Sequence, residues 1–238
     1  MTPLAQYFVP QWISILFLVF IPLPFVLILL FVRREAKRLN LRWAFPVVTA
    51  FFAGYLAYIT FGSFGGWYNE VFFPPKVLLF TTFPYAFLLF GLVLNTRAYQ
   101  AIVQNAKLES LIGLHIFRLV GVFFILLAVH EALPKPFAFI AGIGDMLTAI
   151  SSIWVVRALR DRKSYAKKLA GWWNLFGTVG ILFTAIGANV LTKISIDTGT
   201  MGVDTLATFP FCIIPAFAPP TILFIHWAIY RRLRNFPG

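Results

Sequence analysis

The chain has 238 residues, of which 60% are hydrophobic and 12% are charged, and its formal net charge is +12. A soluble globular domain has about 45–50% apolar and about 25% charged residues, so this composition excludes an ordinary soluble domain. It also excludes a disordered chain, because disordered chains contain few apolar residues. We expect no nucleic-acid partner either, because the positive charge accompanies too few charged and too many apolar residues.

Seven stretches of the sequence are apolar and long enough to cross a membrane as helices. A bilayer core about 30 Å thick needs about 20 mostly apolar residues per helix, whereas barrel strands are shorter and alternate in polarity. The predicted spans are residues 12–32, 44–62, 72–94, 110–133, 136–158, 171–192 and 206–230. The sequence therefore predicts an all-α integral membrane protein in which residues 1–238 form a single bundle of seven transmembrane helices.

Basic residues in the connecting segments predict how the bundle is oriented. Short loops rich in Lys and Arg stay on the cytoplasmic side. The segments after the first, third, fifth and seventh spans contain Arg33, Arg34, Lys37, Arg38, Arg42, Arg97, Lys107, Arg157, Arg160, Arg162, Lys163, Lys167, Lys168, Arg231, Arg232 and Arg234. The opposite side contains only Lys76, Lys135 and Lys193. We expect the N-terminus outside and the C-terminus in the cytoplasm.

This topology favours a bacterial plasma membrane and contacts between the basic loops and anionic lipids. Membrane-protein partners or a homo-oligomer are also compatible with it. Aromatic residues agree with the spans, because Trp and Tyr favour the membrane interface. Those near predicted span ends are Trp12, Trp43, Trp67, Tyr68, Trp172, Trp173, Trp227 and Tyr230. Residues 96–109 have apolar positions at helical spacing and predict a short surface helix.

Two charged side chains, Arg118 and Asp145, fall deep inside predicted spans. A short link with Pro134 and Pro136 joins their spans, which should therefore be antiparallel neighbours. A lone charge near the bilayer centre costs at least about 3 kcal/mol, so we expect the two to form an ion pair. The pair could lock two helices together, or it could be a gate or solute site that opens when the pair breaks.

Three further polar residues, His115, Asn174 and His226, fall at one depth on three predicted spans. His115 precedes Arg118 by three residues and shares its helix face. The three could form one site for a solute or a cofactor, because facing imidazoles can ligate a haem iron or a chlorin magnesium. Alternatively, His226 is an interfacial residue without a ligand. Residues 206–230 contain no lysine for a Schiff base, which argues against retinal.

The last predicted span contains an unusual number of prolines, which are Pro210, Pro215, Pro219 and Pro220. Each proline removes a backbone donor and clashes with the preceding turn. Broken helices often mark the substrate site of a transporter, so this span is a candidate broken helix. Static kinks are the alternative.

Common enzymatic motifs are absent from the sequence, and the single cysteine, Cys212, excludes a disulfide framework and a thiolate metal site. We therefore expect neither an enzyme nor a metal centre. The first hypothesis is a small transporter or permeation protein for anionic or zwitterionic solutes. The alternative is a non-catalytic or cofactor-binding (haem or chlorin) subunit of a larger membrane complex, and the third is a seven-helix sensor.

Overall fold

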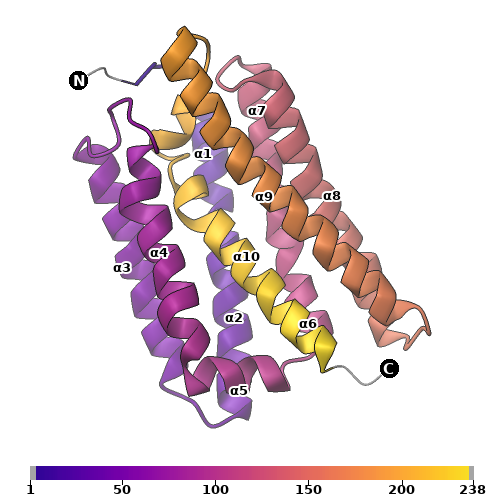
Figure 1. Ribbon diagram of the computed structural model, residues 1–238. Coiled ribbons are helices and arrows are strands. Elements are labelled where there is room, and N and C mark those ends of the chain that lie inside the picture. The colour runs from indigo at the N-terminus through magenta and orange to yellow at the C-terminus, as the bar shows by residue number, and fades with distance from the viewer. Residues whose placement is uncertain (1–3, 236–238) are drawn as a thin grey trace.

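The computed structural model describes residues 4–235, and the described residues form helices without any strand (Figure 1). Within them, seven helices or helical runs are long and apolar enough to cross a membrane. They are Gln11–Arg38, Ala44–Phe64, Leu78–Asn95, Leu108–Val129, Lys135–Arg160, Ala166–Thr198 and Ile213–Arg234. The prediction of an all-helical chain with seven such helices is confirmed. The ends of the chain, residues 1–3 and 236–238, lie outside the described residues.

The individual elements follow one another closely along the chain. The first four runs contain α1 (Gln11–Phe20), α2 (Pro22–Arg38), α3 (Ala44–Phe64), η1 (Leu78–Thr82), α4 (Phe83–Phe87), η2 (Leu88–Leu92), η3 (Val93–Asn95), α6 (Leu108–Gly113), η4 (Leu114–Gly121) and α7 (Val122–Val129). The last three runs are α8 (Lys135–Arg160), α9 (Ala166–Thr198) and α10 (Ile213–Arg234), with η5 (Asp204–Ala207) before α10. Helix α5 (Arg97–Asn105) lies between the third and fourth runs.

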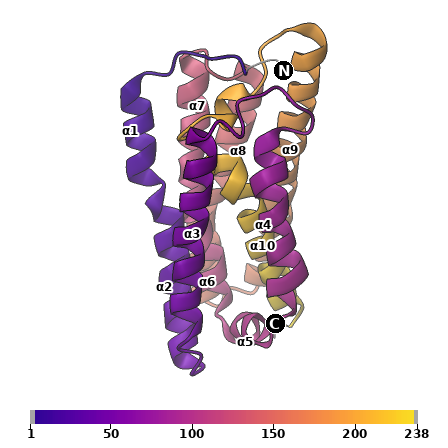
Figure 2. The same cartoon turned by 90° about the vertical axis from the view of Figure 1, so that its left-hand side faces the viewer.

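Helix α10 occupies the middle of the bundle. Figure 1 shows it between α3 and α4 on one side and α7, α8 and α9 on the other, and Figure 2 shows α1 and α2 along a further side. Its contacts include α9, α6, η1 and α4. Two hydrophobic clusters fill the interior, one around Phe17, Phe123 and Phe211 and the other around Phe117 and Ile229. Both clusters include α10, which is therefore the central element of the packing.

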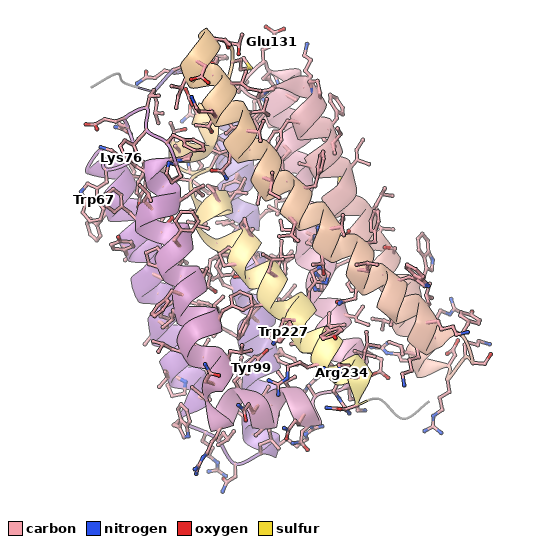
Figure 3. The ribbon with its side chains drawn as sticks, viewed as in Figure 1. Trp67, Lys76, Tyr99, Glu131, Trp227 and Arg234 are labelled. Atoms are coloured by element: carbon pink, nitrogen blue, oxygen red, sulfur yellow. The ribbon has the colours of Figure 1, made fainter. Side chains whose placement is uncertain are left out.

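One end of the bundle carries most of the positive charge, and we call it the basic end. Here α2, α8 and α10 end, and α5 lies across the bundle (Figure 1). Arg38 donates to the carbonyl of Asn105, and Arg232 Nε donates to the carbonyl of Ala106 at 2.9 Å. The two arginines thus hold the C-terminus of α5, where the helix dipole favours positive charge. Figure 3 shows Tyr99 and Arg234 at this end and Lys76 and Glu131 at the other.

The last span differs from the sequence-based expectation. It begins at Ile213 rather than at residue 206, and α10 is one continuous helix through Pro215, Pro219 and Pro220. Pro210 lies in the turn that precedes α10. Pro215 is the third residue of the helix, where a backbone donor has no partner within the helix anyway. The described helix is therefore continuous through these prolines rather than broken.

A hydroxyl from a neighbouring helix compensates for Pro219. Proline has no N–H to donate to the carbonyl four residues earlier, which here belongs to Pro215. Thr82 Oγ1 donates to this carbonyl at 2.7 Å. Since Thr82 ends η1, the bond also joins α10 to the third span.

Pro220 is compensated in the same manner. The carbonyl four residues before it belongs to Ala216, and the Tyr55 hydroxyl of α3 lies 2.9 Å from it. The same hydroxyl lies 3.1 Å from the carbonyl of Thr81. Tyr55 therefore ties three spans together at the point where α10 lacks a backbone donor.

The third span shows the same arrangement at Pro84. Pro84 has no N–H to donate, and the Tyr58 hydroxyl donates to the carbonyl of Phe80, four residues earlier, at 3.0 Å. Thus prolines at three positions are each matched by a hydroxyl from another span. These contacts give a physical reason why the helices continue past their prolines.

Candidate functional site

Arg118 lies at the centre of a buried polar cluster. Its side chain is only 1% exposed, and it projects from η4, midway along the fourth helical run. Its Nε and Nη2 atoms donate to Oδ1 of Asp145 on α8 at 2.9 Å and 2.6 Å. The structure thus brings together the two charged residues that the sequence places deep in adjacent spans.

The other side of the guanidinium faces α9 and α10. Arg118 Nη1 donates to the carbonyl of Gly177 at 3.3 Å and lies 3.2 Å from Nε2 of His226. Because a guanidinium has donors but no acceptor, His226 Nε2 must accept this bond. Arg118 therefore links α8, α9 and α10 through one side chain.

The partners of His226 fix its tautomer. With Nε2 accepting, the proton of a neutral ring lies on Nδ1, which donates to Asn174 Oδ1 at 2.8 Å. Asn174 Nδ2 donates to the His226 carbonyl at 3.3 Å. Both ring nitrogens of His226 are thus engaged, and Asn174 and His226 lie together as the common depth of their positions suggests.

Glycines permit these close contacts. An added Cβ at Gly177 would lie 2.6 Å from the His226 ring and 3.1 Å from Arg118 Nη1. An added Cβ at Gly121 would lie 2.7 Å from Cβ of Asp145, and one at Gly142 would lie 2.6 Å from the carbonyl of Gly121. Helices η4, α8 and α9 can therefore approach the cluster this closely only because these positions have no side chain.

The segment that carries Arg118 has an unusual helical form. Residues Leu114–Gly121 form a 3₁₀-helix of 8 residues between the α-helices α6 and α7, although such runs rarely exceed 3–4 residues. In a 3₁₀-helix the side chains at i and i+3 eclipse each other, so His115 and Arg118 project in one direction. The sequence contains no proline in this run that would produce the change of helix type.

His115 is buried without a polar partner. It is 0% exposed, and neither ring nitrogen has a hydrogen-bond partner among the described residues. Its ring lies 4.2 Å from the His226 ring, centroid to centroid, and 5.1 Å from Trp173. A buried polar group without a hydrogen-bond partner costs about 1–3 kcal/mol. His115 therefore adds to the free-energy cost of burying the cluster, beyond the cost of the ion pair itself.

Trp173 packs against His115 in the interior of the bundle. The sequence places Trp173 at the membrane interface, but α9 begins at Ala166 and Trp173 is only 5% exposed. Its Nε1 donates to the carbonyl of Thr148 at 3.2 Å and to Ser151 Oγ at 3.0 Å. The indole therefore belongs to the buried cluster, and the sequence-based assignment to the interface is corrected.

The two histidines do not fit a haem or chlorin between them. Axial ligation would require one ring nitrogen of each histidine to point at a metal between the rings. His226 has both nitrogens engaged by Arg118 and Asn174, and the His115 ring lies directly against it. The described residues contain no group of three His, Cys, Asp or Glu side chains that could hold a metal ion.

A small cavity lies at the end of the bundle opposite the basic end. Its volume is about 60 Å³, and its lining includes Tyr68, Lys76, Asn189, Asp204 and Pro215. A cavity needs about 10–15 Å³ by this measure to hold one water molecule, so there is room for several. The cavity lies where the first turn of α10 meets α9 and the loop before η1.

A comparison with known proteins gives a family. Residues 74–234 match the model of a family described as a domain of unknown function (DUF8737). The matched region includes Arg118, Asp145, Asn174, His115 and His226, whereas α1, α2 and α3 lie outside it. No curated protein and no solved structure matches the chain.

Proposed function

The chain belongs to the DUF8737 family, and we propose that it is an integral membrane protein that moves small anionic or zwitterionic solutes across the bilayer. In this proposal the N-terminus is outside and the basic end faces the cytoplasm. The Arg118 cluster is the site that the solute reaches, and breakage of the Arg118–Asp145 pair accompanies transport.

The outer surface of the helices supports insertion into a bilayer. Along α9, exposed apolar side chains continue over several turns: Leu175, Phe176, Val179, Leu182, Phe183, Ile186 and Val190. A soluble monomer rarely exposes a continuous apolar surface of this kind. The basic end supports the orientation, because positive loops favour the cytoplasmic side and attract anionic lipids.

The buried arginine carries the transport proposal. A guanidinium has five N–H donors, and its forked geometry matches that of a carboxylate or another oxyanion. Here a single oxygen of Asp145 accepts from both Nε and Nη2. The remaining contacts of Arg118 are the longer ones, at 3.2–3.3 Å, to His226 and Gly177. An oxyanion that replaced the Gly177 carbonyl would find a charged, oriented donor.

A purely structural role explains the cluster less well. Replacing a buried ion pair by apolar residues of similar volume is often neutral or stabilising. A bundle that needed only cohesion at this point would gain nothing from a buried arginine, a buried aspartate and an unpartnered histidine together. The cost of the cluster therefore favours a role beyond packing.

Solute flux into proteoliposomes tests the proposal. A panel of labelled small carboxylates, inorganic oxyanions and amino acids is offered to wild type, Arg118→Met and Asp145→Asn, with Arg97→Met as the control because Arg97 is exposed at the start of α5. We expect flux of at least one solute to fall by about tenfold or more in the two cluster variants, equivalent to about 1.4 kcal/mol, and to persist in the control. If no flux depends on Arg118 or Asp145, the proposed function is wrong.

A further inference from the structure

The two histidines of the cluster differ in their capacity to take up a proton. His226 accepts from Arg118 through Nε2, so a proton added there would oppose the arginine's own N–H group. His115 has two ring nitrogens without a partner, so it can become protonated without breaking a hydrogen bond. His115 is therefore the free proton acceptor of the cluster.

The charges of the whole cluster around Arg118 sum to zero while both histidines are neutral. Arg118 on η4 contributes one positive charge, Asp145 on α8 contributes one negative charge, and α10 contributes His226. Helix α9 contributes Trp173 and Asn174, which are neutral. The helices α2 and α6 add apolar side chains to the same core, such as Leu27 and Leu111. A protonated His115 would leave this interior with one unbalanced positive charge.

An isolated charge in a low-dielectric interior is costly, and an opposite charge nearby reduces that cost. A monovalent anion at Arg118 would alone make the cluster net negative, and a proton on His115 would alone make it net positive. Both together leave it neutral. Each should therefore strengthen the binding of the other, and this coupling is reciprocal.

Helix α9 packs its backbone closely against the guanidinium. An added Cβ at Gly177 would lie 3.1 Å from Nη1, and one at Gly180 would lie 3.9 Å from Nη2. At these two positions α9 therefore places backbone rather than a side chain beside the donors. An oxyanion on Arg118 would displace the 3.3 Å contact to the Gly177 carbonyl and move α9 away from the guanidinium.

We propose that the cluster binds one small monovalent oxyanion and one proton together, with the anion on Arg118 and the proton on His115. Transport is then electroneutral proton–anion symport. This inference rests on the proposed function and names its coupling ion. No bond is made or broken apart from the transfer of a proton from hydronium in the external solution to a ring nitrogen of His115, which leaves a water molecule behind.

Nitrate is the sharpest probe, because it is planar, monovalent and unable to carry a proton itself at working pH. Any proton that accompanies nitrate must then be bound by the protein. In nanodiscs of zwitterionic lipid, ring-nitrogen NMR of ¹⁵N-histidine protein reports the protonated fraction of His115, with the signal assigned by His115→Gln. We expect nitrate to raise the proton affinity of His115 about tenfold in wild type, within the range typical of coupled sites, and not in Arg118→Met. A signal that nitrate leaves unchanged overturns the proposal.

Transport gives the second test. In proteoliposomes that contain a pH dye, we expect external nitrate to acidify the lumen in wild type and in His130→Gln, a control at the far end of the fourth run, where His130 lies against Trp12. His115→Gln should lose the acidification. Nitrate uptake at the wild-type rate without acidification overturns the coupling but leaves the transport function intact. Absence of any Arg118-dependent flux overturns the transport function itself, and the NMR result then decides the coupling on its own.

Discussion

Two polar regions of the bundle differ in how completely their polar groups are satisfied. Around the first turns of α10, hydroxyls of Tyr55 and Thr82 donate to the carbonyls that Pro220 and Pro219 leave free. In the Arg118 cluster, by contrast, a charge pair is buried beside His115, which has no partner. In the first region these hydroxyls satisfy backbone carbonyls, whereas the second region contains more buried polarity than its backbone needs. This excess of buried polar groups distinguishes a candidate functional site from hydrogen bonds that only compensate for prolines in a helix.

The largest expected effect is loss of one member of the ion pair. Asp145→Leu leaves the Arg118 guanidinium buried without its carboxylate, which typically costs about 3–5 kcal/mol. Denaturation in mixed micelles of detergent and SDS measures the free energy of unfolding. Asp161→Leu is the control, because Asp161 follows α8 at the exposed basic end. Equal costs for the two substitutions would mean that the cluster has no special dependence on its charge balance.

The next largest change in stability is expected at Gly177, where α9 lies close to the cluster. Gly177→Ala places a methyl group against His226 and Arg118, and overpacking of this kind costs about 1–3 kcal/mol. Gly171→Ala is a matched control in the same helix, since an added Cβ meets no atom within 4 Å there, and it should gain about 0.5–1 kcal/mol. Thermal melts of both variants measure the difference, and destabilisation by both would contradict the steric explanation.

The hydroxyl that compensates for Pro220 has a smaller effect. Tyr55→Phe leaves the Ala216 carbonyl without its donor, at an expected cost of about 1–2 kcal/mol. Pro220→Ala restores a backbone N–H that can donate to this carbonyl. In the Pro220→Ala background, Tyr55→Phe should therefore cost less than half as much, which a double-mutant cycle measures. An unchanged cost would show that Tyr55 stabilises the bundle by packing rather than by supplying the missing donor.

The smallest effect concerns a group outside the spans. Partial burial raises the pKa of Asp204 above its ordinary value, although the hydrogen bond from the Ala5 backbone N–H at 3.1 Å opposes this. The folded state thus binds this proton more tightly than the unfolded state, so stability falls as pH rises from the unfolded pKa through the folded one. Asp204→Asn should be slightly more stable than wild type at neutral pH, and the difference should vanish near pH 4. A difference in melting temperature that does not change with pH would contradict this.

Much of the fold could be predicted because hydropathy depends on composition along the chain rather than on contacts. The seven runs are each apolar over about the thickness of a bilayer, and charges are so rare within them that Arg118 and Asp145 had few possible partners. The first and last residues of the helices were harder to predict than the number of helices. Helix α9 extends from Ala166 to Thr198, beyond the predicted residues 171–192, because Lys167, Lys168 and Lys193 are compatible with a helix although they are unfavourable for the hydrocarbon core.

The details of the cluster depend on tertiary contacts that sequence patterns do not encode. Nothing between Leu114 and Gly121 signals a 3₁₀-helix, and the contact of Gly177 with His226 depends on how α9 packs against α10. Trp173 gave a misleading signal, since interfacial and buried tryptophans look alike in a sequence. The hydroxyl partners of the prolines were also missed. Each proline in a helix predicts a carbonyl that lacks a backbone donor. Only the packing of the helices identifies Tyr55 and Thr82 as the residues that supply one.

The double variant Arg118→Met/Asp145→Leu tests the central claim most directly, namely that the charge pair serves function rather than folding. Both charges are removed and their volume is replaced by apolar groups, so we expect an unfolding free energy within about 1 kcal/mol of wild type or higher. The variant should at the same time lose the solute flux that depends on Arg118. A double variant as unstable as Asp145→Leu alone would show that the pair holds the fold, and would contradict the account.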